Sequence, residues 1–331
     1  MRAYHLEQLG KLDGLVVSEH EIPSPGNGEV LVRVRASSIN FRDLIIANGW
    51  YSPAVAAGRV PLSDAAGEVE SIGPGVTRFK AGDRVVNSFF PNWFGGTFNA
   101  MPQQWVVDHD GWLAEYKVVN AEALTRMPQH LSFEEAATLP CAGVTAWSAL
   151  AGVSAGDTVL TEGTGGVSLF AIQLAKAIGA RVIATTSSPE KAERVRQLGA
   201  DHVIDYRATK DWGEQARALT GGRGVDRIVE VGGADTLAQS VRAICCGGQI
   251  SLVGILAGAE GGIDFMTMFR THAIFKAIVV GSRRDLEDLS RVLVQHEIRP
   301  VIDSVYAFDD AKAGLSHFAG RLLFGKVVIR H

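Results

Sequence analysis

A glycine-rich turn between an apolar segment and an amphipathic segment is the part of the chain best suited to chemistry. The residues of this turn are Gly163, Thr164, Gly165, Gly166 and Val167. Ser168 stands where the spacing G-x-G-x-x-G would place its last glycine. Glycines let the backbone approach a phosphate, and the N-terminus of the next helix offers free N–H groups and a partial positive charge. An ordinary strand-to-helix turn is the alternative, but a helix closing at Gly179 and a second apolar strand favour a dinucleotide site.

The elements around this turn follow an alternating pattern from about residue 124 onward. Apolar strands are expected at 158–161, 181–185, 202–204, 225–231, 249–253 and 274–281. Helices are expected after the capping box of Ser132 and Glu135, after Pro140, after Ser168, and after the N-cap Ser188 with Pro189. Near-continuous apolar strands that alternate with helices predict an α/β fold with a doubly wound parallel sheet.

The first third of the chain is predicted to be β-rich. Strands are expected at 30–38, 84–88 and 113–119, separated by turn sequences. The segment from Phe89 to Trp112 has little periodicity and carries seven aromatic residues. An irregular segment of this length is usually functional or disordered, and its aromatic content argues against disorder. A lid, a pocket wall, a subunit contact and simple local packing are all open interpretations. The last strand, 326–330, is expected to return to this first domain.

Composition narrows the class of protein. A chain of 331 residues with 47% hydrophobic content predicts two domains. The net charge of −4 gives no basis for binding nucleic acid or an anionic membrane. Three cysteines, Cys141, Cys245 and Cys246, form no even disulfide framework, so reduced thiols are expected. The N-terminus does not resemble a secretion signal, and no apolar run approaches the ~20 residues that cross a bilayer. We therefore expect a cytoplasmic protein.

Several of these segments resemble the medium-chain dehydrogenase/reductase (MDR) superfamily over nearly the whole chain. The segments are SSINFRD, GPGVTRFKAGDRV, LPCAGVTAW, GTGGVSLFAIQLAKAIGA, LGADHVIDYR and GKVVIR. The resemblance implies a Rossmann domain at 125–283 inserted in a β-rich, GroES-like catalytic domain at 1–124 and 284–331. It also implies an active site between the domains and a homodimer or homotetramer.

Zinc-dependent members of this superfamily take catalytic ligands from three positions. In this chain the resemblance places them at Asn40, Ser63 and Cys141, of which only the cysteine binds zinc well. The four cysteines of a structural zinc site are also missing from residues 89–112, and His109 between two aspartates suits a solvated turn. The sequence therefore predicts no bound metal. The chain accordingly resembles the zinc-independent quinone oxidoreductase and enoyl reductase branch, although relatives labelled alcohol dehydrogenase share the same segments.

Without a metal, hydride transfer favours a conjugated acceptor such as a quinone, enone or enal. Delivery to such an acceptor spreads the charge into an enolate or phenolate, which hydrogen-bond donors can stabilise before an acid protonates it. The resemblance suggests Tyr51 as the proton donor, Asn40 as an amide donor near the nicotinamide or substrate, and Thr145 beside the nicotinamide. Asp43 is expected to be structural. Packing or capping roles for Tyr51, Asn40 and Thr145 are the alternatives.

The end of the second Rossmann strand predicts the cofactor. NAD enzymes place an Asp or Glu there, whereas this strand ends in threonines and serines that include Ser187. Hydroxyls and cations accept a 2′-phosphate that a carboxylate would repel. Lys191 and Tyr206 match the 2′-phosphate contacts of quinone oxidoreductases, and Arg207 could assist. We therefore expect NADP(H), with further contacts from Val231, Gly232, Val253 and Ile255.

The expected partner is thus a small, apolar, conjugated substrate, with no nucleic acid and no membrane. Two alternatives stay open: an alcohol dehydrogenase that uses NAD(P), and a dinucleotide-binding protein without catalytic activity.

Overall fold

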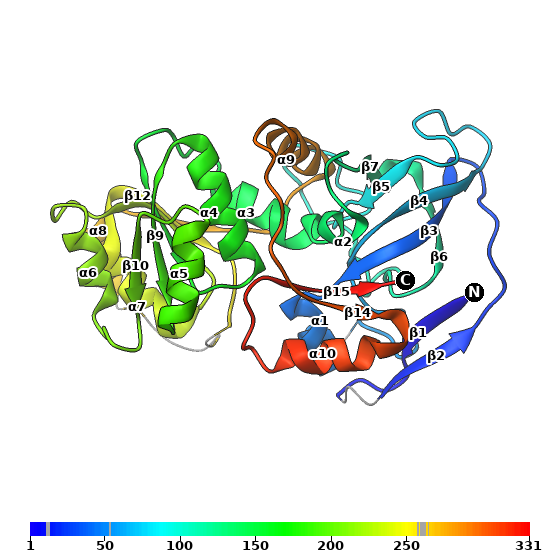
Figure 1. Cartoon of the computed structure of the whole chain (residues 1–331), viewed down its shortest axis with the longest axis horizontal. Coiled ribbons are helices and arrows are strands. Elements are labelled where there is room, and N and C mark those ends of the chain that lie inside the picture. Colours follow the sequence, from blue (N-terminus) through cyan, green and yellow to red (C-terminus); the bar gives the residue numbers. More distant parts are fainter. Residues whose placement is uncertain (11–13, 53, 257, 259–262, 264) are drawn as a thin grey trace. The chain divides into compact units, whose positions relative to one another are not determined.

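The chain forms two compact units in a computed structural model that describes residues 1–331 except 11–13, 53, 257, 259–262 and 264 (Figure 1). The first unit comprises Met1–Val144 and Gly281–His331, and the second comprises Thr145–Val280. In the sequence, the second unit is inserted in the first. The compact second unit begins at Thr145, because the chain before it stays in the first unit, where residues 124–126 pair with residues 85–87. The domain start at residue 125 stays a prediction. The end at Val280 lies close to the predicted 283.

The first unit is built on a mostly antiparallel sheet. Its strand order is β14-β15-β3-β4-β5-β7, with β6 also paired to β3. The strands are β3 (Glu29–Ser38), β4 (Asp64–Ile72), β5 (Arg84–Asn87), β6 (Tyr116–Asn120), β7 (Leu124–Arg126), β14 (Ile302–Ala307) and β15 (Lys326–Arg330). A separate antiparallel pair is formed by β1 (Arg2–Leu6) and β2 (Leu15–Glu19). The strand β15 returns to the first unit as predicted, since it pairs with β3.

One predicted strand in this unit begins later than expected. The sequence predicts a strand over 113–119, whereas β6 begins at Tyr116. Leu113 instead accepts a hydrogen bond from the backbone N–H of Tyr4, and Ala114 bridges Ala3. The first residues of the apolar run therefore pair with β1, and only its end joins β3.

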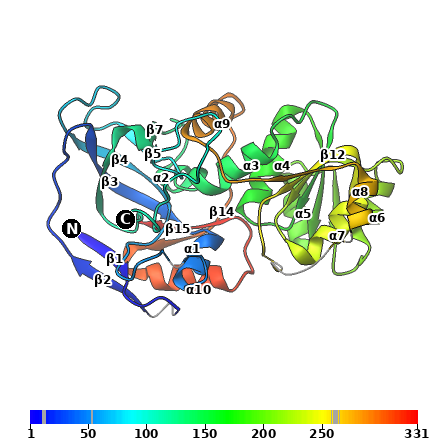
Figure 2. The same ribbon diagram turned by 180° about the vertical axis from the view of Figure 1, so that it is seen from behind.

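Short helices complete the first unit. They are α1 (Phe41–Ala47), α2 (Phe133–Ala136), α9 (Arg283–Gln295) and α10 (Ala311–Ala319), with single turns η2 (Ala121–Ala123), η3 (Leu139–Gly143) and η4 (Phe308–Asp310). The capping box of Ser132 and Glu135 is present at the start of α2, as predicted. Helix α10 packs on β14 and β15, as both views show (Figure 2).

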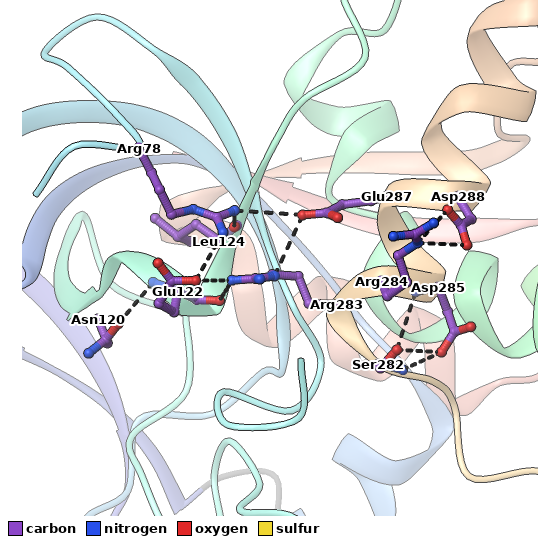
Figure 3. Close-up of polar contacts among 10 residues, drawn as sticks. All are labelled: Arg78, Asn120, Glu122, Leu124, Ser282, Arg283, Arg284, Asp285, Glu287 and Asp288. Carbon is purple, nitrogen blue, oxygen red and sulfur yellow. Dashed lines mark hydrogen bonds and ion pairs between the residues drawn. The ribbon is translucent and has the colours of Figure 1, made fainter. Parts of the chain in front are cut away.

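The start of α9 is tied to the rest of the first unit by an ion-pair network (Figure 3). Ser282 and Asp285 form a capping box. The guanidinium of Arg283 pairs with Glu122 and Glu287, and both carboxylates also pair with Arg78. Alternating charges of this kind hold α9 beside η2 and β7 at the point where the chain re-enters the first unit.

The second unit contains a six-stranded parallel sheet with the order β10-β9-β8-β11-β12-β13. Its strands are β8 (Thr158–Glu162), β9 (Arg181–Thr186), β10 (His202–Asp205), β11 (Val225–Glu230), β12 (Ile244–Leu252) and β13 (Ile274–Ala277). The helices are α3 (Val144–Ala149), α4 (Gly166–Ile178), α5 (Pro189–Gln197), α6 (Trp212–Ala218), α7 (Ala234–Ala243) and α8 (Phe265–Thr271). The order reverses at β8, and right-handed crossovers then place helices on both faces. This is the predicted doubly wound Rossmann sheet.

Two strands of this sheet differ from their predicted bounds. The strand β12 begins at Ile244, not at Gln249, because Ile244 pairs with Val225 before Gly247 and Gly248 shift the register. Glycines interrupt the sequence pattern of a strand, so the first part of β12 was not predicted. The strand β13 ends at Ala277, not Gly281, because its partner β12 ends at Leu252. Among the described residues, no helix has the length and apolar content needed to cross a membrane.

Candidate active site

Asn40 lies at the centre of a buried polar cluster in the first unit. It is the N-cap of α1, directly after β3, and only 6% of its surface is exposed. Its Nδ2 donates to Asp64 Oδ2 at 2.9 Å, and its Oδ1 accepts from Lys326 Nζ at 2.5 Å. A carboxylate on one side and an ammonium on the other fix the orientation of the amide. Asn40 is therefore a bridge between two buried charges, in addition to its role as a helix cap.

Burial shapes the charges of this cluster. Removal from water raises the pKa of Asp64 to about 7, although the nearby Lys326 ammonium and the Asn40 amide oppose the rise. Burial likewise lowers the pKa of Lys326, while Asp64 favours its charged form. Lys326 also donates to the carbonyl of Ile39 at 2.5 Å. Asp64 Oδ2 accepts from Asn40 and from the backbone N–H of Cys141, whereas the buried Oδ1 has no hydrogen-bond partner among the described residues.

Ser63 and Asp43 form the neighbouring part of the cluster with Arg42. The guanidinium of Arg42 donates to the hydroxyl of Ser63 and to the carbonyl of Trp105. Asp43 accepts from the backbone N–H of Asn40 at 2.8 Å and from the Ser63 hydroxyl at 3.5 Å. Asp43 therefore contributes to the structure of the α1 start, which is the role expected for it.

The donor set at the three zinc-ligand positions is a poor fit for zinc. The oxygen of Asn40 is occupied by an ammonium, and that of Ser63 by a guanidinium. Burial raises the pKa of the Cys141 thiol, which opposes the thiolate that zinc needs. The described part of the chain contains no group of three or more His, Cys, Asp or Glu residues arranged to hold a metal. A divalent ion at these positions would have to displace the ammonium from Asn40 and the guanidinium from Ser63.

Tyr51 lies shortly after the end of α1, and 36% of its surface is exposed. Its hydroxyl donates to Gln104 Oε1 at 2.7 Å. The guanidinium of Arg42 lies 4.7 Å from the centroid of its ring. The phenol is therefore neither buried in the core nor free, but held at both its ring and its hydroxyl while part of it faces solvent.

Both ends of the aromatic segment that precedes β6 are packed inside the first unit, whereas most residues from 92 to 103 are exposed. Trp105 and Trp112 belong to the hydrophobic core and meet edge to face at 5.4 Å. The carbonyls of Trp93 and Phe94 accept hydrogen bonds from the first N–H groups of α9. Phe94 and Phe98, in the same segment, are exposed to solvent. Local packing, one of the four open interpretations, accounts for the buried rings.

Thr145 is the second residue of α3 and is 4% exposed. The turn η3 directly before α3 is a π-helix that carries Pro140 and Cys141. Such turns are rare in proteins and are frequent at functional sites. The position of Thr145 after this turn agrees with the expected functional role. That role stays a prediction.

The predicted cofactor residues of the second unit gather at the carboxyl edge of its parallel sheet. Ligands of doubly wound sheets bind outside this edge where the strand order reverses, which here lies between β8 and β11. The residues at this edge are Gly163 after β8, Ser187 after β9, Tyr206 after β10, Val231 after β11, and Val253 and Ile255 after β12. The backbone N–H of Val253 donates to Glu230, so its carbonyl is the group left for a ligand.

The glycine turn has the conformation that a phosphate site needs. Gly163 adopts φ +68°, a left-handed conformation that favours glycine. Gly165 is the N-cap of α4 and has no side chain to cap the first N–H groups of this helix. Ser168 replaces the third glycine without strain, because its buried hydroxyl donates to the carbonyl of Glu162 at 2.6 Å. Thr164 lies in the same turn, whereas Gly166 and Val167 are the first residues of α4, which begins before Ser168 and not after it because Gly165 is the N-cap.

The residues expected at a 2′-phosphate lie at the adjoining strand ends. Lys191 is on the first turn of α5, where its backbone N–H donates to the N-cap Ser188 at 3.2 Å. Tyr206 is exposed, and its N–H donates to Thr186. Asp205 pairs in register with Thr186, but its Oδ1 accepts from the N–H of Arg207 at 2.8 Å. The nearest acid is therefore engaged by its own turn.

Two buried carboxyl groups below this edge were not predicted from the sequence. Glu162 ends β8 and Glu230 ends β11, and both are almost fully buried. Glu162 Oε2 accepts from the N–H groups of Val231 and Gly232, each at 3.1 Å. Burial, reinforced by the charge of Glu230, raises the pKa of Glu162 well above its ordinary value. The two carboxyl groups hold the loop after β11, which contains the predicted cofactor contacts Val231 and Gly232.

Other residues of the cluster also escaped the sequence analysis. Arg42, in the segment SSINFRD, lies between Phe41 and Asp43 and gave no distinct signal. Lys326, in the segment GKVVIR, precedes an apolar run, and a charged residue beside such a run was the available signal. Asp64 begins an apolar strand and gave a similar signal. Gln104 gave none.

Comparison with known proteins agrees with this architecture. Residues 26–129 match the model described as the alcohol dehydrogenase GroES-like domain, and residues 166–295 match the zinc-binding dehydrogenase model. A zinc-type alcohol dehydrogenase-like protein of Schizosaccharomyces pombe is 40% identical over 98% of this chain and 97% of its own length. The acryloyl-coenzyme A reductase of Metallosphaera sedula is 28% identical over 97% of each chain. The crystal structure of a putative alcohol dehydrogenase from Sinorhizobium meliloti superposes with a TM-score of 0.93 at 40% identity, covering 100% of this chain and 98% of the other.

The chain belongs to the medium-chain dehydrogenase/reductase superfamily. It is an oxidoreductase of that superfamily, with a GroES-like domain and a Rossmann-type dinucleotide-binding domain. The predicted superfamily and fold class are confirmed.

Proposed function

We propose that the protein is a zinc-independent, NADPH-dependent reductase of conjugated acceptors such as enals, enones or quinones. The observation that carries this proposal is the environment of Asn40 and Ser63, where Lys326 and Arg42 supply the cationic groups. A site built in this way lacks the ligands of a catalytic zinc, which needs three protein ligands and an open position. The full alkoxide charge of an isolated carbonyl would then be poorly stabilised, whereas a delocalised charge needs only hydrogen-bond donors.

Side chains of the first unit provide those donors. Asn40 has two N–H groups, of which one is bonded to Asp64, and the second is the proposed donor toward a substrate oxygen. Tyr51 is the proposed acid, because a phenol is protonated at neutral pH and can give up its proton to the carbon or oxygen that gains charge. The guanidinium of Arg42 over the Tyr51 ring would attract the charge left on the phenol oxygen.

Residues of the second unit fit a dinucleotide with a 2′-phosphate. When bound, the nicotinamide would supply the hydride. The uncapped N-terminus of α4 would hold the pyrophosphate through its N–H groups. Lys191, Ser187 and Tyr206 would hold the 2′-phosphate.

A matched pair of substrates tests the reaction. Crotonaldehyde and butyraldehyde have the same carbon chain and differ in one conjugated double bond. We expect NADPH to be consumed with crotonaldehyde, with a kcat/KM at least about 100-fold above that for butyraldehyde and above that with NADH. Product analysis should show butyraldehyde and no crotyl alcohol, because the hydride goes to the far carbon of the conjugated system.

The relatives named as alcohol dehydrogenases favour a second candidate, reversible oxidation of alcohols. This candidate predicts equal turnover of the two aldehydes and oxidation of butanol with NADP⁺ or NAD⁺. It also predicts about one zinc ion per chain in the purified protein and loss of activity with a chelator. Those results together would replace the proposal. A chain without turnover on any of these substrates, but with NADPH quenching its tryptophan fluorescence, would instead be a binding protein.

A further inference from the structure

Gln104 contacts two residues of the first unit, Tyr51 and Arg42, which lie 53 and 62 positions before it in the sequence. Its Oε1 accepts from the hydroxyl of Tyr51 at 2.7 Å and from a guanidinium nitrogen of Arg42 at 3.2 Å. One amide oxygen has two lone pairs, so both bonds can form together. The phenol hydroxyl is thus tied to a buried cation through a single neutral side chain.

Arg42, at one end of this link, is held in a fixed position by its own contacts. Its guanidinium lies between two aromatic rings, 4.7 Å from the centroid of Tyr51 and 5.0 Å from that of Phe89. It also donates to Ser63 and, through both terminal nitrogens, to the carbonyl of Trp105. A planar guanidinium with this many partners has one orientation, and the nitrogen that faces Gln104 is therefore fixed.

The backbone of Gln104 is also held firmly. Its N–H donates to Asp108 Oδ2 at 2.7 Å, and its carbonyl accepts from the N–H of Asp108 at 2.9 Å. The next residue, Trp105, is 4% exposed and donates from its indole nitrogen to the carbonyl of Ser88 at 2.8 Å. Gln104 therefore projects from a closed turn anchored in the core.

Tyr51 lies on a more exposed segment than Arg42. It follows Gly49, which adopts φ +74°, and Trp50, whose side chain is 81% exposed. The contacts at its hydroxyl and on its ring come from Gln104 and Arg42. A half-exposed phenol on such a segment would otherwise sample several rotamers, and ordering it costs free energy in each catalytic cycle.

We infer that Gln104, fixed by Arg42, is a positioning residue that holds the Tyr51 hydroxyl in place for proton transfer. The inference rests on the proposed function, in which Tyr51 is the acid. Gln104 itself touches no reacting atom. Its amide oxygen accepts a hydrogen bond from the phenol and so orients the hydroxyl before the substrate arrives. The phenol then gives its proton to the substrate when a stronger acceptor forms there.

Three variants test this inference in the full chain. Gln104→Met keeps the length of the side chain and removes the acceptor, while Gln104→Glu keeps an acceptor. Gln103→Met is the matched control, because Gln103 contacts His109 at 3.1 Å and not Tyr51. Each is made alone and together with Tyr51→Phe, with crotonaldehyde as the substrate and quenching of tryptophan fluorescence by NADPH as the check on folding.

We expect Gln104→Met to lower kcat about three- to tenfold, the loss typical of one neutral hydrogen bond, with NADPH affinity unchanged. Gln104→Glu should retain more activity than Gln104→Met, and Gln103→Met should match the wild type. In the Tyr51→Phe background, which should already be about 100-fold slower, Gln104→Met should have no further effect.

Two results would overturn the inference in different ways. If Tyr51→Phe slows the enzyme but Gln104→Met does not, Gln104 has no positioning role and the proposed function stands. The positioning role is likewise excluded if Gln104→Met lowers kcat equally with and without the Tyr51 hydroxyl, because a purely structural role has that signature. If Tyr51→Phe leaves kcat unchanged, Tyr51 is not the acid and Gln104 has no proton donor to position, whereas the proposed reaction is still decided by the two aldehydes.

Discussion

The paired carboxyl groups of Glu162 and Glu230 predict an unusual dependence of stability on pH. The hydroxyl of Ser240 lies 3.0 Å from Glu162 Oε1 and 2.5 Å from Glu230 Oε2. A serine carries one hydrogen and cannot donate to both acids. The contacts are all satisfied if Glu162 is protonated and donates to Ser240, which in turn donates to Glu230. Glu162→Gln reproduces that state, since its amide nitrogen can donate to Ser240 and its oxygen can accept from Val231.

The sign and size of the effect follow from the raised pKa of Glu162. In the unfolded chain this carboxyl loses its proton near pH 4.5, whereas the folded protein keeps it. Folding therefore takes up a proton above pH 4.5, and the free energy of unfolding falls by about 1.4 kcal/mol per pH unit until the folded-state pKa is reached. Gln needs no proton, so the variant should become more stable than the wild type by that amount per pH unit.

Urea denaturation at pH 5.5, 6.5 and 7.5, followed by tryptophan fluorescence, measures this difference. Trp212 reports on the second unit because it is buried in the same core as β8 and β11. The matched control is Glu190→Gln at an exposed position on α5, which should follow the wild type at each pH. The stability of wild type and Glu162→Gln could depend on pH in the same way, or Glu162→Gln could be the less stable protein at pH 7.5. Either result would show that Glu162 does not hold a proton in the folded protein.

Three further predictions concern the two halves of the candidate site. Lys191→Ala should raise the KM for NADPH about 10-fold or more and leave that for NADH nearly unchanged, as initial rates with each cofactor will show. Gly163→Ala should lower the free energy of unfolding by about 1 kcal/mol or more in urea titrations, since φ +68° is strained for alanine. Asp64, with its pKa raised to about 7, should make stability fall between about pH 4 and pH 7, and Asp64→Asn should flatten that part of the pH profile.

Local patterns were sufficient to predict the second unit. The glycine turn, the N-cap Ser188 and the apolar strands depend on neighbours within a few residues, and each is present in the structure. Glycines limited the accuracy at β12, where Gly247 and Gly248 interrupt an apolar run but not the strand. Strand ends were less predictable, because they depend on where the partner strand stops.

The polar cluster of the first unit depends on contacts that no local pattern encodes. Lys326 bonds to Asn40 across 286 residues of chain, and Tyr51 bonds to Gln104 across 53. The sequence indicated Asn40 and Tyr51 only through a resemblance to relatives. It gave no means to infer what each side chain contacts, because that depends on how β3, β4 and β15 pair.

The names of several relatives suggest a zinc-dependent alcohol dehydrogenase, whereas the proposed function is a reduction without zinc. The charged side chains of the site are the basis of that proposal. Residues 166–295 match the zinc-binding dehydrogenase model, and residues 26–129 match that of the alcohol dehydrogenase GroES-like domain. In this chain Lys326 lies against Asn40, and Arg42 lies against Ser63. In the proposed function, this ammonium and this guanidinium occupy the oxygens that a divalent ion would need, and hydrogen bonding stabilises the negative charge on the substrate.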